Sequence, residues 1–208
     1  MSEDVDVVME SGAGGEGLVL TGPWGTERIG DAPPVVREAL RRMQLGPVLL
    51  ANLEPLPGGS MPRGCVYFVL LPVLDRLSHL VVRSLGVDDL GGPLLSVCPV
   101  SRPARFTPVR LPPRRPVRMP REVSLTLEDA GFALESELSP FRVVLHRPEA
   151  ALVAALLAWP VTPDALSEAL PLPREVTRGI VDYLAAAGMA TPVDDPDVTA
   201  ASRLPARS

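Results

Sequence analysis

The sequence predicts an α+β fold of two tandem winged-helix-like modules, each with three strands and three helices, joined by a Pro/Arg-rich linker. Three observations support this prediction. Residues 122–192 show three alternating segments followed by three helical ones, the order of a winged helix-turn-helix. Residues 17–100 carry a degenerate version of that order. Residues 101–121 hold seven arginines, six prolines and no acid, a composition typical of a stiff, extended chain.

The strands of the second module are predicted from alternation. Apolar and polar residues alternate through 123–128, 132–138 and 141–146, the period of half-buried strands, with a turn at 129–131. In the last of these segments every odd-numbered residue is apolar, so we expect these residues to face the core.

Three helices are predicted after these strands. The first, residues 149–158, is apolar nearly all round, so we expect it to be buried. The second begins at Pro163, after Thr162 as its N-cap. The third begins near Pro173 and ends at Gly188, a residue type that favours helix C-caps.

The first module is predicted from weaker patterns. A helix over residues 34–43 places apolar residues on one face and charged residues on the other. Pro72 is expected to limit or bend a second helix. The expected elements also include strands at 18–20 and 26–29, a helix at 66–80 and a hairpin of 80–85 with 94–98.

The two ends of the chain are predicted to be disordered tails. Residues 1–16 are acidic and Gly-rich with little to bury, and residues 193–208 are similar. The predicted division of the chain is therefore 1–16, 17–100, 101–121, 122–192 and 193–208.

The chain carries no feature of an exported or membrane protein. Residues 1–16 contain no basic residue, unlike a signal peptide, and the longest apolar runs fall well short of the ~20 residues that cross a bilayer. We therefore expect a cytoplasmic protein without a membrane partner. Cys65 and Cys98 lie in separate apolar runs and are expected to be buried thiols.

No catalytic, cofactor-binding or metal-binding residue is predicted. His79 and His146 are the two histidines, and both are interpreted as structural or surface residues. Two cysteines and two histidines at these spacings do not form a metal site. The chain has no lysine and so no phosphate loop of the Walker type.

Two features are candidates for binding. The seven arginines of residues 101–121, in a chain of net charge −5, are interpreted as a solvated linker or as a contact for an acidic peptide, a partner subunit or nucleic acid. The third helix of the second module has two arginines and two acids, and a neutral helix is poorly suited to DNA, so a nucleic-acid partner is not expected.

A peptide is the ligand that the second module is predicted to bind. We expect the outer edge of strand 141–146 to be free, where an extended peptide can add as one more strand beside the third helix. The predicted peptide-binding residues are Arg142, Val144, His146, Arg174 and Arg178.

Two stretches of the chain resemble a known family. "SELSPFRVVLHRPEAALVAALLAWPVTPDALSEALPLPREVTRGIVDYLAAAGMAT" and "LTGPWGTERIGDAPPVVREALRRM" are similar to the N-terminal region of actinobacterial SagB-type azoline dehydrogenases. The resemblance covers most of residues 17–192. It lies in Ser139-Pro140, Pro160-Val161-Thr162, the Leu-Pro before the third helix and the closing Ala-Ala-Gly.

The resemblance implies a winged-helix region that recognises the leader peptide of a ribosomally made precursor. In the family a flavin-binding domain follows, whereas this chain stops at Ser208. We therefore expect a non-catalytic subunit in thiazole/oxazole peptide biosynthesis, including thiopeptides. It would bind the leader peptide, dock a separate flavin-dependent dehydrogenase that carries FMN, or do both. The alternatives are a winged-helix transcriptional regulator, an enzyme with an unrecognised site and a structural or vestigial module.

Overall fold

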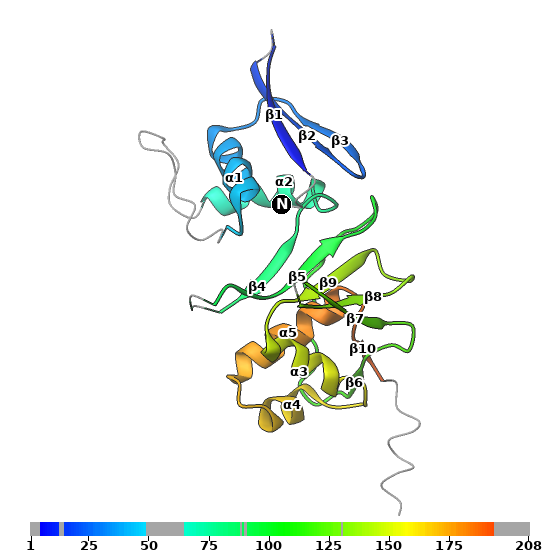
Figure 1. The fold of residues 1–208 in the computed structure, drawn as a ribbon. Helices are drawn as coiled ribbons and strands as arrows, with labels where there is room; N and C mark the ends of the chain where they lie inside the picture. The colour runs from blue at the N-terminus through cyan, green and yellow to red at the C-terminus, as the bar shows by residue number, and fades with distance from the viewer. Residues whose placement is uncertain are drawn as a thin grey trace, which may run out of the picture.

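The computed structural model describes residues 5–12, 15–48, 65–87, 89, 91–129 and 131–193. These residues form ten strands and five helices, and all the paired strands are antiparallel. The predicted α+β class is confirmed, and Figure 1 shows the strands and helices gathered into an upper and a lower unit. The predicted tail after Val193 lies outside the described residues.

The N-terminal unit is a three-stranded sheet packed against two helices. Its sheet has the order β1-β2-β3, and the strands predicted at 18–20 and 26–29 are confirmed within the last two of these. The first strand corrects the prediction that residues 1–16 form a tail. The acidic side chain of Asp6 is exposed on that strand, whereas Val5 is buried. The prediction was wrong because acidic residues on the exposed side of a strand give the segment the composition of a disordered tail. The elements are β1 (Asp6–Gly12), β2 (Gly15–Gly22), β3 (Gly25–Ile29), α1 (Pro34–Leu45) and α2 (Cys65–Arg76).

The core of this unit lies between its sheet and the two helices. The predicted apolar face of α1 is buried, and α2 contributes Leu70 and Leu74. Pro72 lies inside α2, which ends at Arg76, four residues before the predicted end. The predicted third helix of this module is not found among the residues that the structure describes.

The C-terminal unit is built on a five-stranded sheet of order β4-β5-β9-β8-β7. The hairpin predicted for the first module is confirmed as a hairpin, but its second strand pairs with β9. The predicted module boundary at residue 100 is therefore wrong, and the units divide between Val81 and Arg83. The strands are β4 (Arg83–Gly86), β5 (Pro93–Pro99), β7 (Ser124–Glu128), β8 (Gly131–Glu135) and β9 (Phe141–Leu145).

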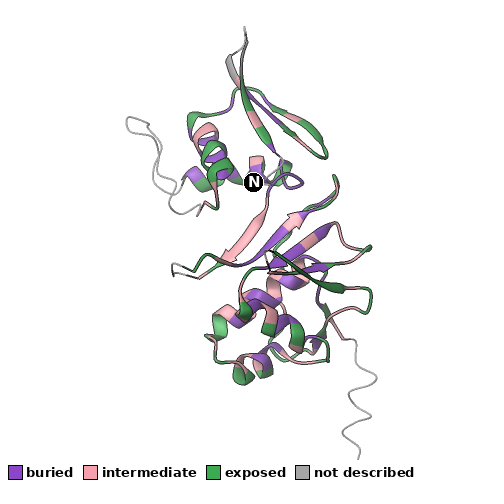
Figure 2. Cartoon of the chain, viewed as in Figure 1, coloured by how far each residue is buried: buried purple, intermediate pink, exposed green. Residues whose placement is uncertain are grey.

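Three helices cover one face of this sheet, as Figures 1 and 2 show. They are α3 (Pro148–Leu156), α4 (Pro163–Ala169) and α5 (Arg174–Ala186), so the predicted order of strands and helices is confirmed. Thr162 Oγ1 accepts the Ala165 N–H at 3.2 Å and caps α4 as predicted. At the end of α5, Gly188 has a φ of +74°. The helix α3 is not buried throughout, because Leu152 is half exposed.

The Pro/Arg-rich segment is part of the C-terminal unit and not a linker between the units. Within it, β6 (Val117–Arg118) pairs with β10 (Thr191–Pro192), and Ala104 and Val117 are buried in the core. Phe106 packs against the rings of Phe141 and Tyr183, with centroids 6.0 and 5.2 Å away. The prediction failed because a few apolar residues spaced among the arginines anchor the whole segment.

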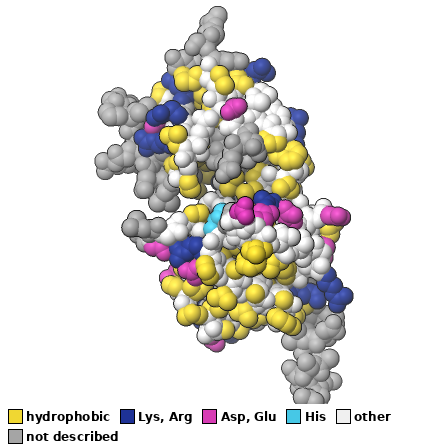
Figure 3. Space-filling model, in the orientation of Figure 1, with side chains coloured by type: hydrophobic (Ala, Val, Ile, Leu, Met, Phe, Trp, Pro, Cys, Tyr) yellow, Lys and Arg dark blue, Asp and Glu magenta, His cyan; other side chains and the backbone are white. Residues whose placement is uncertain are grey.

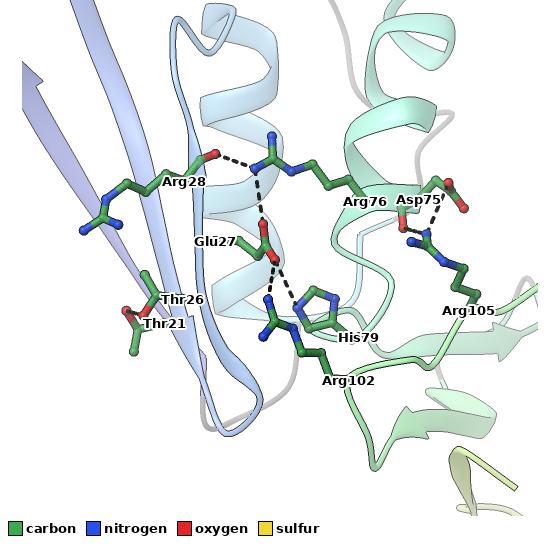
Figure 4. A network of polar contacts seen from close by, with 9 residues as sticks. All are labelled: Thr21, Thr26, Glu27, Arg28, Asp75, Arg76, His79, Arg102 and Arg105. Atoms are coloured by element: carbon green, nitrogen blue, oxygen red, sulfur yellow. Dashed lines mark hydrogen bonds and ion pairs between the residues drawn. The ribbon is translucent and has the colours of Figure 1, made fainter.

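A polar cluster joins the two units, and Figure 4 shows its geometry. Glu27 Oε2 of β3 lies 3.2 Å from Arg76 Nη2. Glu27 Oε1 lies 3.8 Å from His79 Nε2 and 4.0 Å from Arg102 Nη2. The Phe106 N–H also donates to Ser78 Oγ at 3.1 Å. Residues 102–106 therefore attach the C-terminal unit to the end of α2.

His79 makes this junction sensitive to acid. The side chain is buried, and its Nε2 has no hydrogen-bond partner among the residues described. Burial lowers the pKa of His79 from 6.5, Glu27 opposes this effect, and Arg102 and Arg105 add to it. The folded chain therefore takes up this proton only at a lower pH than the unfolded chain does.

We expect the free energy of unfolding to fall as the pH drops from about 7.5 to about 5.5, because the unfolded state gains a proton on His79 that the folded state lacks. The H79Q variant should lose this part of the slope, and the control variant H146Q should retain it. Urea unfolding at several pH values measures both slopes. Equal slopes in wild type and H79Q would contradict the expectation.

Candidate functional site

The outer edge of strand 141–146, predicted to bind peptide, is not free. β5 pairs with β9 along its whole length, from Leu95 opposite Leu145 to Pro99 opposite Phe141. β8 pairs with the other side of β9, which is therefore an interior strand. The prediction is wrong because the β4–β5 hairpin, assigned to the first module, extends the sheet on that side.

The predicted residues Arg142, Val144 and His146 alternate with the residues of β9 that face the helices, so they lie on the opposite face of the sheet. Val144 is buried between Ser96 and Ala133. The Arg142 guanidinium pairs with Glu128 and, through Nε at 2.8 Å, with Glu135. None of the three side chains presents a free edge or an unpaired charge to a peptide.

Arg174 and Arg178 form a separate group on the helical side of the sheet. Arg178 Nη2 lies 2.7 Å from Asp164 Oδ1 of α4, and Arg174 Nη2 lies 3.8 Å from the same oxygen. The hydrogen bond from Arg178 holds the pKa of Asp164 below its usual value. The five predicted residues therefore occupy two faces of the sheet and do not form one site.

The Pro/Arg-rich segment crosses the surface of α4 and α5 beside these arginines. The Leu111 N–H donates to Asp182 Oδ1 at 3.0 Å, and the Asp164 N–H donates to Pro113 O at 3.0 Å. These two bonds hold the segment along one wall of a cavity of about 460 Å³ on α5. The cavity is lined by Arg110, Leu111, Pro113, Pro163, Arg174, Glu175, Arg178, Gly179 and Asp182.

A free strand edge adjoins this cavity. β4 ends the five-stranded sheet and pairs with β5 alone. Gly179 lines the cavity and also faces β4, since a Cβ added to it would lie 3.5 Å from Leu85 Cδ2. This part of α5 therefore lies within van der Waals distance of the edge strand. We call the edge of Arg83–Gly86 together with the cavity the β4–α5 groove.

The β4–α5 groove offers cationic donors. Arg110 makes no ion pair within the described part of the chain, and the Arg83 and Arg178 Nε atoms are buried without an acceptor there. Asp182 is engaged by the Leu111 N–H. An acceptor that enters the groove, such as a carboxylate, can therefore pair with the guanidinium of Arg110.

A polar chain on the opposite face of the sheet was missed by sequence reasoning. Ser84 Oγ lies 2.9 Å from Ser96 Oγ, which lies 2.9 Å from His146 Nε2. Facing serines at the predicted hairpin positions were the available signal. Nucleophilic catalysis requires an acid that orients the histidine, and no such acid contacts His146 among the described residues. The chain instead ties β4, β5 and β9 together.

No group of three or more His, Cys, Asp or Glu suited to a metal ion occurs in the described residues. Cys98, expected to be buried, is half-buried and forms no disulfide among the described residues, and the Cys65 side chain lies outside the described part of the structure. No helix in the described ranges is long and apolar enough to cross a membrane. In the comparisons with known proteins, no family model and no curated protein matches this chain.

Proposed function

We propose that this protein is a non-catalytic subunit of a peptide-modifying complex and that it holds the leader segment of a precursor peptide in the β4–α5 groove. The observation that carries the proposal is the unpaired edge of β4 beside a basic cavity on α5. In this proposal β7–β9 and α3–α5 form a winged-helix-like module, which the β4–β5 hairpin extends by two strands.

Strand addition explains how one groove can bind an extended peptide. The backbone of the peptide pairs with β4, and alternate side chains point toward α5. Acidic side chains on that side meet Arg110, which makes no ion pair among the described residues, and Arg174, whose Nη2 lies 3.8 Å from Asp164. Backbone pairing supplies affinity for an extended chain, and the arginines select acidic sequences.

A titration with labelled synthetic peptides tests this function. One peptide alternates Val with Glu, and the matched peptide alternates Val with Lys. We expect the acidic peptide to bind at least about tenfold more tightly, and its affinity to fall as salt is added, because the selecting contacts are between charges. Equal affinities for the two peptides would refute the proposed site.

The resemblance to azoline dehydrogenases supports a flavoprotein as the partner within the complex. We expect the purified chain to lack FMN and to co-purify with a separate FMN oxidoreductase when the two genes are expressed together. Absorbance near 450 nm measures the flavin. A yellow preparation of this chain alone with stoichiometric flavin would contradict the expectation, and so would full dehydrogenase activity without this subunit.

A further inference from the structure

The other end of the five-stranded sheet also has a free edge. β7 pairs with β8 alone, and all five of its residues are exposed. Leu127 is 75% exposed and Leu125 is 50% exposed. Their cross-strand neighbours on β8 are Phe132 and Leu134, on the face of the sheet that is packed against the core. An edge strand of this kind, exposed on both sides, is a template for pairing with another strand.

The ladder between β7 and β8 indicates which backbone groups face outward. Glu128 is opposite Gly131 next to a tight turn, and such a pair is hydrogen-bonded in a two-residue hairpin. Because hydrogen-bonded and non-bonded pairs alternate, the N–H and C=O groups of Leu125 and Leu127 point to the outer edge. Both residues therefore offer donors and acceptors to an added strand.

Apolar surface continues from β7 onto α3. Leu127 is opposite Phe132, which lines a cavity of about 330 Å³ together with Leu145, Ala151 and the half-exposed Leu152. In Figure 3, hydrophobic side chains gather on the lower unit, over the region that β7 and α3 occupy in Figure 1. A strand added at β7 would cover part of this surface.

The sequence of β7 is complementary to itself. Its sequence is Ser-Leu-Thr-Leu-Glu. An antiparallel pairing centred on Thr126 places Leu125 of each copy opposite Leu127 of the other copy, so the interface contains two such pairs. Leu125 and Leu127 are also the residues whose backbone groups face outward, so this register forms about four backbone hydrogen bonds. A two-fold interface needs this self-complementarity, since each copy presents the same patch.

The charges at the two ends of β7 favour the same arrangement. Arg118, Arg121 and Glu122 precede the strand, for a net charge of +1, whereas Glu128 is its last residue and Asp129 follows it. Neither Arg121 nor Asp129 makes an ion pair within the described residues. Antiparallel pairing brings the basic end of one copy to the acidic end of the other at both ends of the interface.

We propose that two copies of this protein associate through antiparallel pairing of their β7 strands, centred on Thr126, into one continuous sheet. This proposal does not depend on the proposed function, because the β4–α5 groove lies at the other end of the sheet. The dimer would present two such grooves, one at each end of its sheet.

Sedimentation velocity over a range of concentrations tests the dimer. We expect a species of twice the chain mass of 22.1 kDa. In L127R, a charge on the pairing edge should raise the dissociation constant at least about tenfold. The control is L138R, because Leu138 is 79% exposed and lies outside β7. A wild-type monomer at all concentrations, or equal dimerisation of L127R and wild type, would overturn the proposal.

A cross-link tests the register. In the proposed pairing the two Thr126 side chains face each other across the two-fold axis, with Cβ atoms about 4.5–5.5 Å apart, within reach of a disulfide after a small adjustment. The T126C variant should therefore form a covalent dimer under mild oxidation, whereas L138C should not. A covalent dimer in both variants, or in neither, would contradict this register.

Discussion

The R110E/R174E double variant is expected to bind the acidic peptide about 10- to 100-fold more weakly than wild type and to remain folded. Each substitution replaces a cation in the β4–α5 groove by an anion, and charge-assisted contacts are worth about 1.5–3 kcal/mol. Fluorescence anisotropy of the labelled peptide measures the loss, and circular dichroism checks the fold.

The matched control is R118E/R121E, which makes the same change of net charge, with both substitutions in the Pro/Arg-rich segment and outside the groove. Arg178 is left unchanged because its guanidinium holds Asp164 at 2.7 Å, so its reversal would set two anions against each other between α4 and α5. If the control weakened binding as much as R110E/R174E does, the effect would reflect net charge and not the groove.

The G131A variant is expected to lose about 2–5 kcal/mol of stability. Gly131 begins β8 with a φ of +125°, where L side chains are strained, and an added Cβ would lie 2.2 Å from the Leu145 carbonyl oxygen. Strain and overpacking each cost about 1–3 kcal/mol, and here the neighbour is backbone of the central strand and cannot move aside.

G25A provides the control for this prediction. Gly25 has a similar φ of +118°, but no atom lies within 4 Å of an added Cβ. We therefore expect G25A to lose only the strain contribution, about 1–2 kcal/mol. Urea unfolding of both variants gives the difference, and equal losses would show that the close approach of Gly131 to β9 contributes nothing.

Local patterns in the sequence predicted most individual elements. The alternation in residues 141–145 correctly indicated that Phe141, Val143 and Leu145 face the helices. Helix boundaries marked by Thr162 and Gly188 were also correct, because a cap depends on the residues beside it.

Alternation does not reveal which strand lies alongside another. The hairpin of residues 80–98 was recognised, yet nothing in its sequence indicates that Leu95 and Val97 pair with Leu145 and Val143. Because of this one pairing, the predicted module boundary at residue 100 and the predicted free edge of β9 are both wrong. Composition misled in the Pro/Arg-rich segment, where Phe106 and Val117 hold an otherwise charged chain against the core.

The candidate groove could be predicted only in part. Arg174 and Arg178 lie one helical turn apart, so their grouping follows from the sequence. The other parts of the groove come from three separate regions of the chain: the β4 edge with Arg83, Arg110 and Gly179. Only the folded chain brings these three regions together. In the Ser84–Ser96–His146 chain, the hairpin pattern could indicate the two serines, but nothing local indicates that His146 joins them.

Amide hydrogen exchange, measured with and without the acidic peptide, tests the central claim most directly. Strand addition gives hydrogen-bond partners to amides that were on a free edge, so we expect exchange in residues 83–86 to slow at least about tenfold on peptide binding. Exchange in β7 should not change. Two outcomes would contradict the proposed groove. In one, exchange slows in residues 124–128 but is unchanged in residues 83–86; in the other, the peptide binds and exchange slows in neither strand.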